Sequence, residues 1–407
     1  MKKIKATIIT DGIYPYSMGG SHRFVYELLE KIDNKKYDVT CIVPEIDKKS
    51  DFAINQTEII PSFKVIKLKT KFKNKFLRLF ISFYSLYQQS IKTVLESDII
   101  NIHYLPALFN LRNITAKQKK IYYTFHGPWS EEFNLSIIGK LESKNIILSL
   151  FYKFFFKRIV RYILFKIEKN SFNHVSEFMC LSEYMKNKLI NTFKIDEEKI
   201  KIIHSGVDIN TFKIVKNKTF RKKISHGRKF VFITVRRLEK RMGLNNLIIA
   251  CNMLKKKNSD FILNICGKGN YHPYLKRQIK KLKLDDHVKL YGFVDDDILV
   301  QMLSNSDLFI LPSIDLEGFG LVILESMACG TPVLSSPHGG SKEIISILDN
   351  NLIMSSARPE DILNSLKNFI ENKIIINDDN FYRKFVYDNF SWSKATNEYL
   401  NWIKIDD

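Results

Sequence analysis

The stretch from Leu311 to Leu334 constrains the fold of this chain more than any other part of the sequence. It begins at the end of an apolar run of strand length, Asp307–Pro312. A loop follows, and apolar residues then recur at helical spacing over Leu321–Cys329. Gly330 and Pro332 are typical of residues that end a helix. The pattern therefore predicts a strand, a loop and a helix in immediate succession.

Two carboxylates, Glu317 and Glu325, bracket this loop. At a helical rise of about 1.5 Å per residue they would lie roughly 12 Å apart if both were helical. That separation is too large for a shared acid/base pair and suits the two ends of one elongated ligand. Backbone N–H groups at a helix start favour an anion, and glycines permit close approach of a ligand. The residues placed to do this are Gly318, Phe319, Gly320 and Leu321.

The stretch resembles the glutamate–seven–glutamate signature of the retaining glycosyltransferases of family 4, or glycosyl transferases group 1, which have the GT-B fold. Gly-Phe-Gly lies between the glutamates, Pro-Ser precedes them and Gly-Thr-Pro-Val follows. The resemblance continues from about residue 4 to about residue 404. It implies two Rossmann-like, doubly wound parallel-sheet α/β domains facing across a cleft. We expect an acceptor-side domain over 1–205, a nucleotide-sugar-binding domain over 206–386, and a C-terminal helix over 387–407 that returns to the first domain.

The first half of the chain alternates apolar runs with helical stretches, the pattern of a doubly wound α/β domain. After its first strand, Gly19 and Gly20 open a helix and match the glycine-rich loop of the family, which implies that they contact the donor. The segments expected to form strands in this half are Ile4–Thr10, Val39–Pro44, Phe63–Leu68, Asp98–Tyr104, Lys120–Phe125 and Val175–Leu181.

His126 directly follows one of these strands, at the edge where open α/β sheets bind ligands. Taken alone, it could equally be a loop histidine bonded to the backbone. The family has a matching His-Gly, and the resemblance implies that His126 approaches the donor sugar. It also implies that Glu317 lies beside that sugar and that Glu325 binds the ribose. We therefore take His126 and Glu317 as the candidate catalytic residues.

The second half repeats the α/β pattern after a basic segment, Lys213–Lys229, that is predicted to be the interdomain linker. Gly267 follows one predicted strand and Phe293 follows the next. The resemblance implies donor contacts for both, with the nucleobase near Phe293. The strands expected in this half are Phe230–Val235, Phe261–Cys266, His287–Tyr291 and Asp307–Pro312.

The cations for a diphosphate are expected in the loop after the first of these strands. Arg237 occupies the arginine position of the family's Gly-Arg-Leu motif, although Arg236 replaces the glycine before it. Met242 stands where the family has a lysine. Arg241 can supply the missing cation because arginine binds phosphate oxygens in a bidentate manner. Which of Arg241 and Lys240 reaches the diphosphate stays open at this point.

The chain carries 64 Lys and Arg against 43 Asp and Glu, a net charge of +21. Such an excess indicates an anionic partner or a compositional bias. Two segments combine basic and aromatic residues, Lys71–Lys92 and Phe151–Lys169. The second is a predicted amphipathic helix that could lie on an anionic membrane or pack on its own core with a solvated basic face. The expected membrane contacts are Lys153, Lys157, Arg158 and Arg161.

The five cysteines are scattered and lie in or beside apolar runs, which predicts reduced, buried thiols. The N-terminal apolar segment is too short for a signal peptide, and no run of eighteen uncharged apolar residues occurs. We therefore expect a cytoplasmic enzyme that associates peripherally with the inner face of a membrane. The resemblance implies no metal or other cofactor.

The function expected from the resemblance is retaining transfer of a sugar from a UDP- or GDP-sugar to a glycan or lipid-linked acceptor, in bacterial surface polysaccharide or lipopolysaccharide assembly. Nucleic-acid binding is one alternative suggested by the charge, although no nucleic-acid-binding motif is present, and we expect no nucleic-acid partner. A sugar-nucleotide epimerase of the same fold is another. The sequence does not reveal the nucleotide, the sugar or the acceptor.

Overall fold

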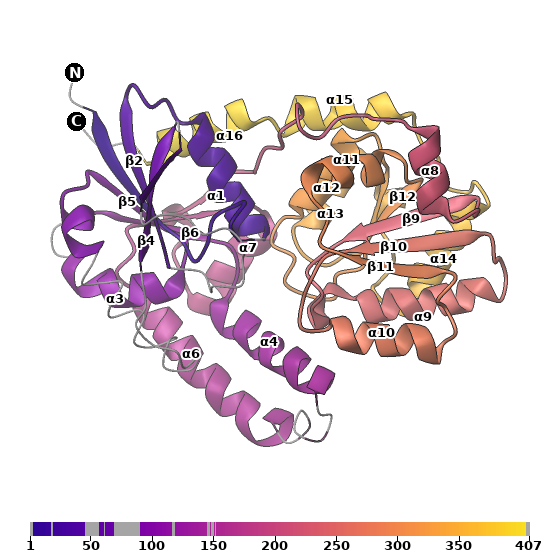
Figure 1. The fold of residues 1–407 in the computed structure, drawn as a ribbon. Helices are drawn as coiled ribbons and strands as arrows, with labels where there is room; N and C mark the ends of the chain where they lie inside the picture. Colours follow the sequence, from indigo (N-terminus) through magenta and orange to yellow (C-terminus); the bar gives the residue numbers. More distant parts are fainter. Residues whose placement is uncertain are drawn as a thin grey trace. The chain divides into compact units, whose positions relative to one another are not determined.

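The structure is a computed structural model that describes residues 3–17, 19–44, 57–60, 62–68, 90–115, 119–144, 147, 150 and 152–403. The chain forms two compact units (Figure 1). The first consists of Met1–Ser130, Tyr162–Ser205 and Trp392–Asp407, and the second of Glu131–Arg161 and Gly206–Ser391. The expected first domain, 1–205, differs from the first unit in residues 131–161. The expected C-terminal segment started at residue 387 rather than 392.

An eight-stranded sheet forms the centre of the first unit, in the order β3-β4-β2-β1-β5-β6-β7-β8. Neighbouring strands are parallel, except that β3 is antiparallel to β4 at one edge. Strands β5 and β6 are buried along their whole length, as continuous apolar runs predict for parallel strands. The strands are β1 Ile4–Ile9, β2 Tyr37–Pro44, β3 Thr57–Ile60, β4 Phe63–Leu68, β5 Ile99–Ile102, β6 Ile121–Phe125, β7 Glu177–Cys180 and β8 Ile200–Ile202.

Helices cover this sheet. One apolar core joins the strands to α3 and α7 and to Phe172 at the end of α6. The C-terminal helix α16 packs against α1, where the Trp392 indole N–H donates to the Glu27 carboxylate. Helices α4 and α6 each contain residues of both units. The elements are α1 Gly20–Lys31, α3 Leu105–Thr115, α4 Trp129–Lys144, the π-helical turn η1 Tyr152–Phe156, α6 Lys157–Phe172, α7 Glu183–Lys188, η2 Leu189–Phe193, η3 Glu197–Lys199 and α16 Trp392–Trp402.

A five-stranded parallel sheet forms the centre of the second unit, in the order β11-β10-β9-β12-β13. Because every strand runs the same way, all carboxyl ends meet at one edge, where open α/β sheets bind their ligands. The strands are β9 Phe230–Val235, β10 Phe261–Cys266, β11 Val288–Gly292, β12 Leu308–Leu311 and β13 Val333–Ser335.

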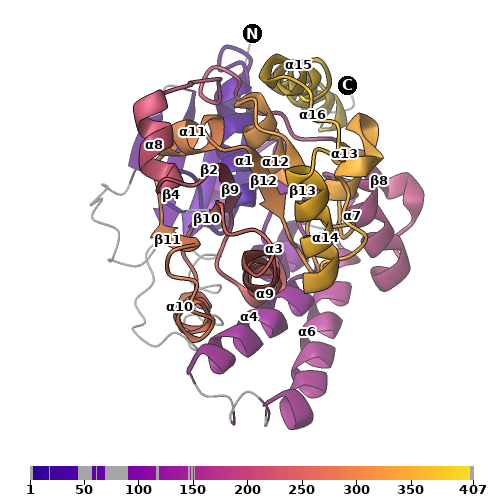
Figure 2. The same ribbon diagram turned by 90° about the vertical axis from the view of Figure 1, so that its right-hand side faces the viewer.

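Helices α9, α10 and α14 share one apolar core with this sheet and cover one of its faces (Figures 1 and 2). Helices α8 and α11 pack together, and α12 packs against α15. The elements are α8 Lys218–Ser225, η4 Lys240–Met242, α9 Leu244–Lys255, α10 His272–Lys281, α11 Asp296–Ser304, α12 Leu321–Ala328, α13 Ser341–Leu348, η5 Asn350–Leu352, α14 Pro359–Ile370 and α15 Asp379–Asn389.

Helix α8 corrects the prediction that residues 213–229 form only a linker. The Asn217 side chain accepts a hydrogen bond from the Phe220 N–H and starts the helix as its N-cap. Arg221 then donates to the carbonyl of Asn305 at 2.8 Å and pairs with Asp307 at 2.7 Å. These contacts tie the basic segment to the second unit, so it is part of that unit's fold.

The strand predictions differ from the structure mainly at their ends. Three predicted strands coincide with β4, β9 and β10, and the other seven differ from the structure by one or two residues at one or both ends. The short strands β3, β8 and β13 were not predicted. The five cysteines, all in the described part of the chain, form no disulfide and are buried, as expected. Burial raises the pKa of Cys41, Cys251 and Cys266 to about 12. Within the described ranges, no helix is both long and apolar enough to cross a membrane.

Candidate functional site

The loops at the carboxyl edge of the second sheet approach one another backbone to backbone. Gly267 follows β10, and a Cβ atom there would lie 1.8 Å from the carbonyl oxygen of Arg236 in the loop after β9. Gly339 follows β13, and a Cβ atom there would lie 2.3 Å from the carbonyl oxygen of Glu317. A side chain at either position would push the loops apart. The two glycines therefore allow these loops to pack closely at the carboxyl edge of the sheet.

Arg236 and Glu317 form a buried ion pair at this edge. One Arg236 Nη atom donates to a Glu317 carboxylate oxygen, to Ser313 Oγ at 2.9 Å and to Met242 Sδ at 2.8 Å. Ser313 also donates to the same carboxylate at 2.8 Å. Burial alone would raise the pKa of Glu317, but Arg236 and the hydrogen bonds outweigh it, so the pKa lies below its usual range. Glu317 is thus held as a carboxylate.

This pair adds a residue, Arg236, that our interpretation of the loop after β9 left without a role. We assigned no role to Arg236, because it replaces a glycine, and assigned the diphosphate contact to Arg237. In the structure Arg236 is buried and Arg237 is exposed. The guanidinium of Arg236 lies against Met242, the residue that replaces the family's lysine. The coincidence of these two departures in the sequence was a signal that could have drawn attention to Arg236.

Arg241 is partly buried and already has acceptors. Its Nη1 donates to the carbonyl of Leu316 at 2.7 Å, and its guanidinium lies 3.2 Å from Glu132 and 3.5 Å from Glu239. It is therefore fixed beside the loop that carries Glu317. Lys240 lies in the same 3₁₀ turn, η4, and is partly buried. The positions of Arg241 and Lys240 therefore do not decide which of them would bind the diphosphate.

Helix α12 begins at Leu321, as predicted, after Gly320 in a left-handed conformation at φ 97°. Phe319, Gly320 and Glu325 are buried, and Gly318 and Leu321 are partly buried. Only Glu325 is helical, since Glu317 precedes the helix in the loop. The separation estimated for two helical glutamates therefore does not apply.

Gly267 and Phe293 follow the neighbouring strands β10 and β11 at this edge of the sheet. The Gly267 N–H donates to the carbonyl of Gly292 at 2.6 Å, next to Phe293. The Phe293 ring is exposed, and Lys268 Nζ lies 5.3 Å from its centroid. An exposed aromatic ring with a cation above it can stack on a planar ligand.

In the first unit, the predicted glycine loop precedes α1. Gly19 is extended and Gly20 is the first residue of the helix. His22 in the first turn contacts Asp11 Oδ1 at 2.9 Å through Nε2 and Ser17 Oγ at 2.8 Å through Nδ1. These contacts fold the loop after β1 onto the start of α1.

His126 directly follows β6, as predicted, and is part of a buried polar network. Its Nε2 lies 3.0 Å from Nδ1 of His103, which follows β5. Burial lowers the pKa of His126 to about 4, although Asp11 opposes the shift, and burial lowers the pKa of His103 well below its usual value. The two imidazoles are therefore neutral at pH 7. The Nε2 atom of His126 therefore contacts a side chain, and not the backbone as the alternative interpretation expected.

The basic helix predicted over Phe151–Lys169 is present as η1 and α6, and its apolar side chains are exposed. Phe154 is 78% exposed. Arg158 and Arg161 are exposed and Lys157 is partly buried, whereas the side chain of Lys153 and residues 69–89 lie outside the described part of the chain. The other exposed apolar residues here are Phe155, Phe156, Ile159, Tyr162 and Ile163. A helix packed on its own core would bury these side chains.

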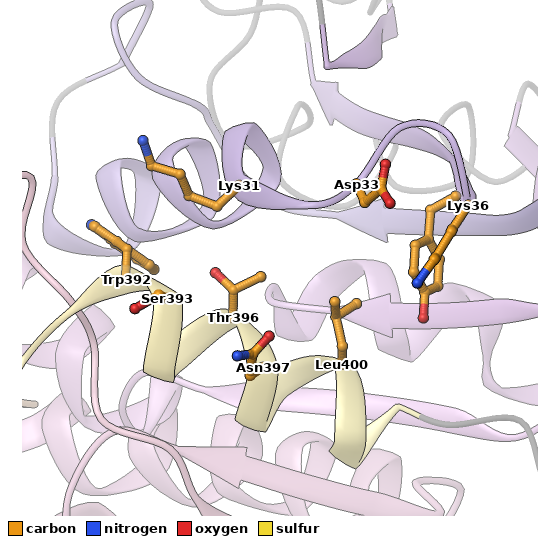
Figure 3. Close-up of a pocket in the computed structure, with 9 residues that line it drawn as sticks. Lys31, Asp33, Lys36, Trp392, Ser393, Thr396, Asn397 and Leu400 are labelled. Atoms are coloured by element: carbon orange, nitrogen blue, oxygen red, sulfur yellow. The ribbon is translucent and has the colours of Figure 1, made fainter.

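A cavity of about 580 Å³ lies elsewhere in the first unit, between the end of α1 and α16 (Figure 3). None of the predicted site residues lines it. In the described part of the chain, no group of three or more His, Cys, Asp or Glu is placed to hold a metal ion. The lining residues are Lys31, Asp33, Lys36, Tyr37, Trp392, Ser393, Thr396, Asn397 and Leu400.

Comparisons with known proteins agree with this architecture. The family model described as Glycosyltransferase Family 4 matches residues 18–211, and the one described as Glycosyl transferases group 1 matches residues 215–388. An uncharacterized glycosyltransferase of Methanocaldococcus jannaschii is 27% identical over 98% of each chain. The amylovoran biosynthesis glycosyltransferase AmsK of Erwinia amylovora is 32% identical over 40% of each chain. HepE of Anabaena, crystallised with UDP and glucose, is 18% identical, with a TM-score of 0.72 over 98% of each chain.

Proposed function

Because this chain belongs to the family 4, group 1 glycosyltransferases and has their GT-B fold, we propose that it moves a sugar from a nucleoside-diphosphate sugar to an acceptor hydroxyl with retention of configuration. The bond between the anomeric carbon and the diphosphate breaks. The acceptor oxygen bonds to the same carbon, and its proton passes to the leaving diphosphate. The observation that carries this proposal is the loop between β12 and α12, where two buried glutamates flank a glycine-containing helix start at the ligand-binding edge of a parallel sheet.

We assign roles along that loop from the nucleotide to the sugar. Glu325 accepts hydrogen bonds from the ribose hydroxyls. The N–H groups at the start of α12, from Gly318 to Leu321, stabilise the charge that develops on the leaving diphosphate, since such stabilisation is usually the largest catalytic contribution. Arg237 and Arg241 add positive charge there. Phe293 stacks on the base.

At the sugar end, Glu317 provides a fixed negative charge beside the anomeric centre, where positive charge develops as the bond breaks. The ion pair with Arg236 supports this role, because it fixes both the charge and the position of the carboxylate. His126 contacts the sugar from the first unit, and Gly19 and Gly20 allow close approach there.

We propose a UDP- or GDP-sugar as the donor and a glycan or lipid-linked glycan as the acceptor. The UDP in the HepE crystals supports the nucleotide class. The role of AmsK in amylovoran biosynthesis supports a place in bacterial surface polysaccharide or lipopolysaccharide assembly. A thermal-shift series with UDP-, GDP- and ADP-sugars tests the donor class. A duplex DNA control at several salt concentrations tests the nucleic-acid alternative. Formation of an epimeric sugar nucleotide without an acceptor, rather than of a free sugar, tests the epimerase alternative.

We also propose that the cytoplasmic enzyme works at the inner face of a membrane, bound through η1 and the first part of α6. Phe154, Phe155 and Ile159 expose large apolar side chains, and the exposed Arg158 and Arg161 lie on either side of Ile159 in the sequence. An interfacial helix of this composition inserts its apolar side chains at the headgroup boundary, and each basic residue near an anionic surface adds about 1 kcal/mol.

Co-sedimentation with vesicles tests this membrane surface. The protein should bind anionic vesicles, bind neutral ones weakly and be released by high salt, because exposed charges are screened over about 8–10 Å at physiological ionic strength. Replacing Lys153, Lys157, Arg158 and Arg161 with Gln should abolish most of the binding and leave nucleotide binding intact. The matched control replaces four basic residues of α10 in the same way: Lys276, Arg277, Lys280 and Lys281. Equal losses in the two variants would show that only the net charge matters.

A further inference from the structure

The imidazole of His126 is one end of a hydrogen-bonded series that lies entirely within the first unit. His126 Nε2 contacts His103 Nδ1 at 3.0 Å, and His103 Nε2 contacts Asn101 Oδ1 at 2.6 Å. The Tyr399 hydroxyl of α16 donates to the same Asn101 oxygen at 2.9 Å. Asn101, His103 and Tyr399 are all buried. The proposed function used only His126.

The direction of each hydrogen bond in this series follows from the orientation of Asn101. Its Nδ2 donates to the backbone carbonyl of Tyr122 at 3.2 Å and to Thr124 Oγ1 at 3.1 Å. A carbonyl oxygen can only accept, so the amide nitrogen must face Tyr122 and the amide oxygen must face His103. An amide oxygen is also only an acceptor. His103 therefore carries its proton on Nε2.

A neutral His103 with its proton on Nε2 has a bare Nδ1 that can only accept. The contact with His126 then requires that His126 Nε2 carries a proton and donates it. Burial keeps both rings neutral, and the other titratable groups that shift the pKa of His126 are Asp11, which raises it, and His22, which lowers it. A neutral His126 with its proton on Nε2 has its lone pair on Nδ1, and no described residue hydrogen-bonds to that atom.

We propose that His103 is a positioning residue that fixes His126 in the Nε2–H tautomer, so that His126 meets the donor sugar only as a hydrogen-bond acceptor, through Nδ1. This rests on the proposed place of His126 beside the sugar. The donor sugar must then present a hydroxyl to His126. A carboxylate at that point, as in a uronic acid, has no proton to donate and is excluded.

Nuclear magnetic resonance of the full chain labelled with ¹⁵N-histidine tests the tautomer without any assay of activity. The chain has nine histidines, and a His126→Asn variant identifies the signals of this ring. At pH 7 the Nε2–H form should exceed the Nδ1–H form by roughly tenfold or more, since the alternative leaves a buried acceptor unpaired. A predominant Nδ1–H form, or a ring protonated on both nitrogens at pH 7, overturns the proposal.

Two substitutions of His103 separate positioning from packing. In His103→Gln the amide can still accept from His126 and donate to Asn101, so the tautomer and turnover should be largely retained. In His103→Phe no acceptor remains, so both tautomers should be populated and turnover should fall, with little change in KM for the donor. Equal effects of Gln and Phe on the tautomer overturn the proposal. If the tautomer is fixed as described but no sugar is transferred, the proposed function fails and the assignment of His103 stands.

Discussion

The buried ion pair of Arg236 and Glu317 allows a quantitative prediction about stability. Their side chains are 5% and 11% exposed, so removing one partner leaves the other charged and desolvated. Such a change typically costs about 3–5 kcal/mol. We expect this loss in the free energy of unfolding for Arg236→Met, whose side chain is similarly long. Arg237→Met is the matched control, because its side chain is exposed and a surface change usually stays within about 0.5 kcal/mol.

The pH dependence of this variant should change in sign. In the wild type the pKa of Glu317 is lowered in the folded state, so its contribution is present above the unfolded pKa of about 4.3 and is lost as pH falls through the folded value. In Arg236→Met, burial still raises the pKa of Glu317, but the arginine that most strongly lowers this pKa is gone. The contribution of Glu317 to stability should then increase as pH falls towards 4.3.

Urea unfolding at pH 7 and pH 5 measures both the loss of stability and its pH dependence. The proteins to compare are the wild type, Arg236→Met, Glu317→Gln, the double variant Arg236→Met/Glu317→Gln and the control Arg237→Met. The double variant should be more stable than Arg236→Met alone, because the glutamine that replaces Glu317 carries no buried charge and can still accept from Ser313. A loss below about 1 kcal/mol for Arg236→Met with an unchanged pH dependence would refute the buried pair. Independent effects of the two substitutions would refute it equally.

Five single substitutions test the proposed ligand contacts. Glu325→Gln should weaken binding of the free nucleoside diphosphate by about 1.5–3 kcal/mol in calorimetry, as the loss of a charged hydrogen bond predicts, and unchanged affinity would remove the ribose role. Arg237→Ala and Arg241→Ala should each weaken diphosphate binding whereas Lys240→Ala should not, and the reverse order would show that our alignment of this loop is shifted. His126→Ala should lower turnover much more than donor affinity. Activity within about twofold of the wild type would show that His126 is an ordinary loop histidine.

The strand–loop–helix around Glu317 could be predicted from sequence because each of its features is local. An apolar run makes β12, a glycine precedes α12 and apolar spacing continues to Ala328. The position of His126 was predicted for the same reason, since it directly follows a buried strand. The edge strands β3 and β8 were missed because they are only four and three residues long, which is too short to establish an apolar pattern.

The partners of these residues could not be predicted, because they come from distant parts of the chain. Arg236 reaches Glu317 across 81 positions of sequence, and Tyr399 reaches Asn101 across 298. The role of Arg236 was also hidden by the family pattern, which has a glycine there. Similarly, the basic composition of residues 213–229 concealed α8, whose N-cap at Asn217 was the local signal.

Retaining sugar transfer can be followed directly by ¹H nuclear magnetic resonance of a nucleotide sugar incubated with the enzyme, starting with a UDP- or GDP-hexose of α configuration. Slow transfer to water is expected even without the acceptor. We expect release of the nucleoside diphosphate together with a sugar that first appears in the α configuration, and loss of this release in Glu317→Gln. Release of a β sugar would contradict retention, and an intact donor across the UDP, GDP and ADP series would contradict the proposed activity itself.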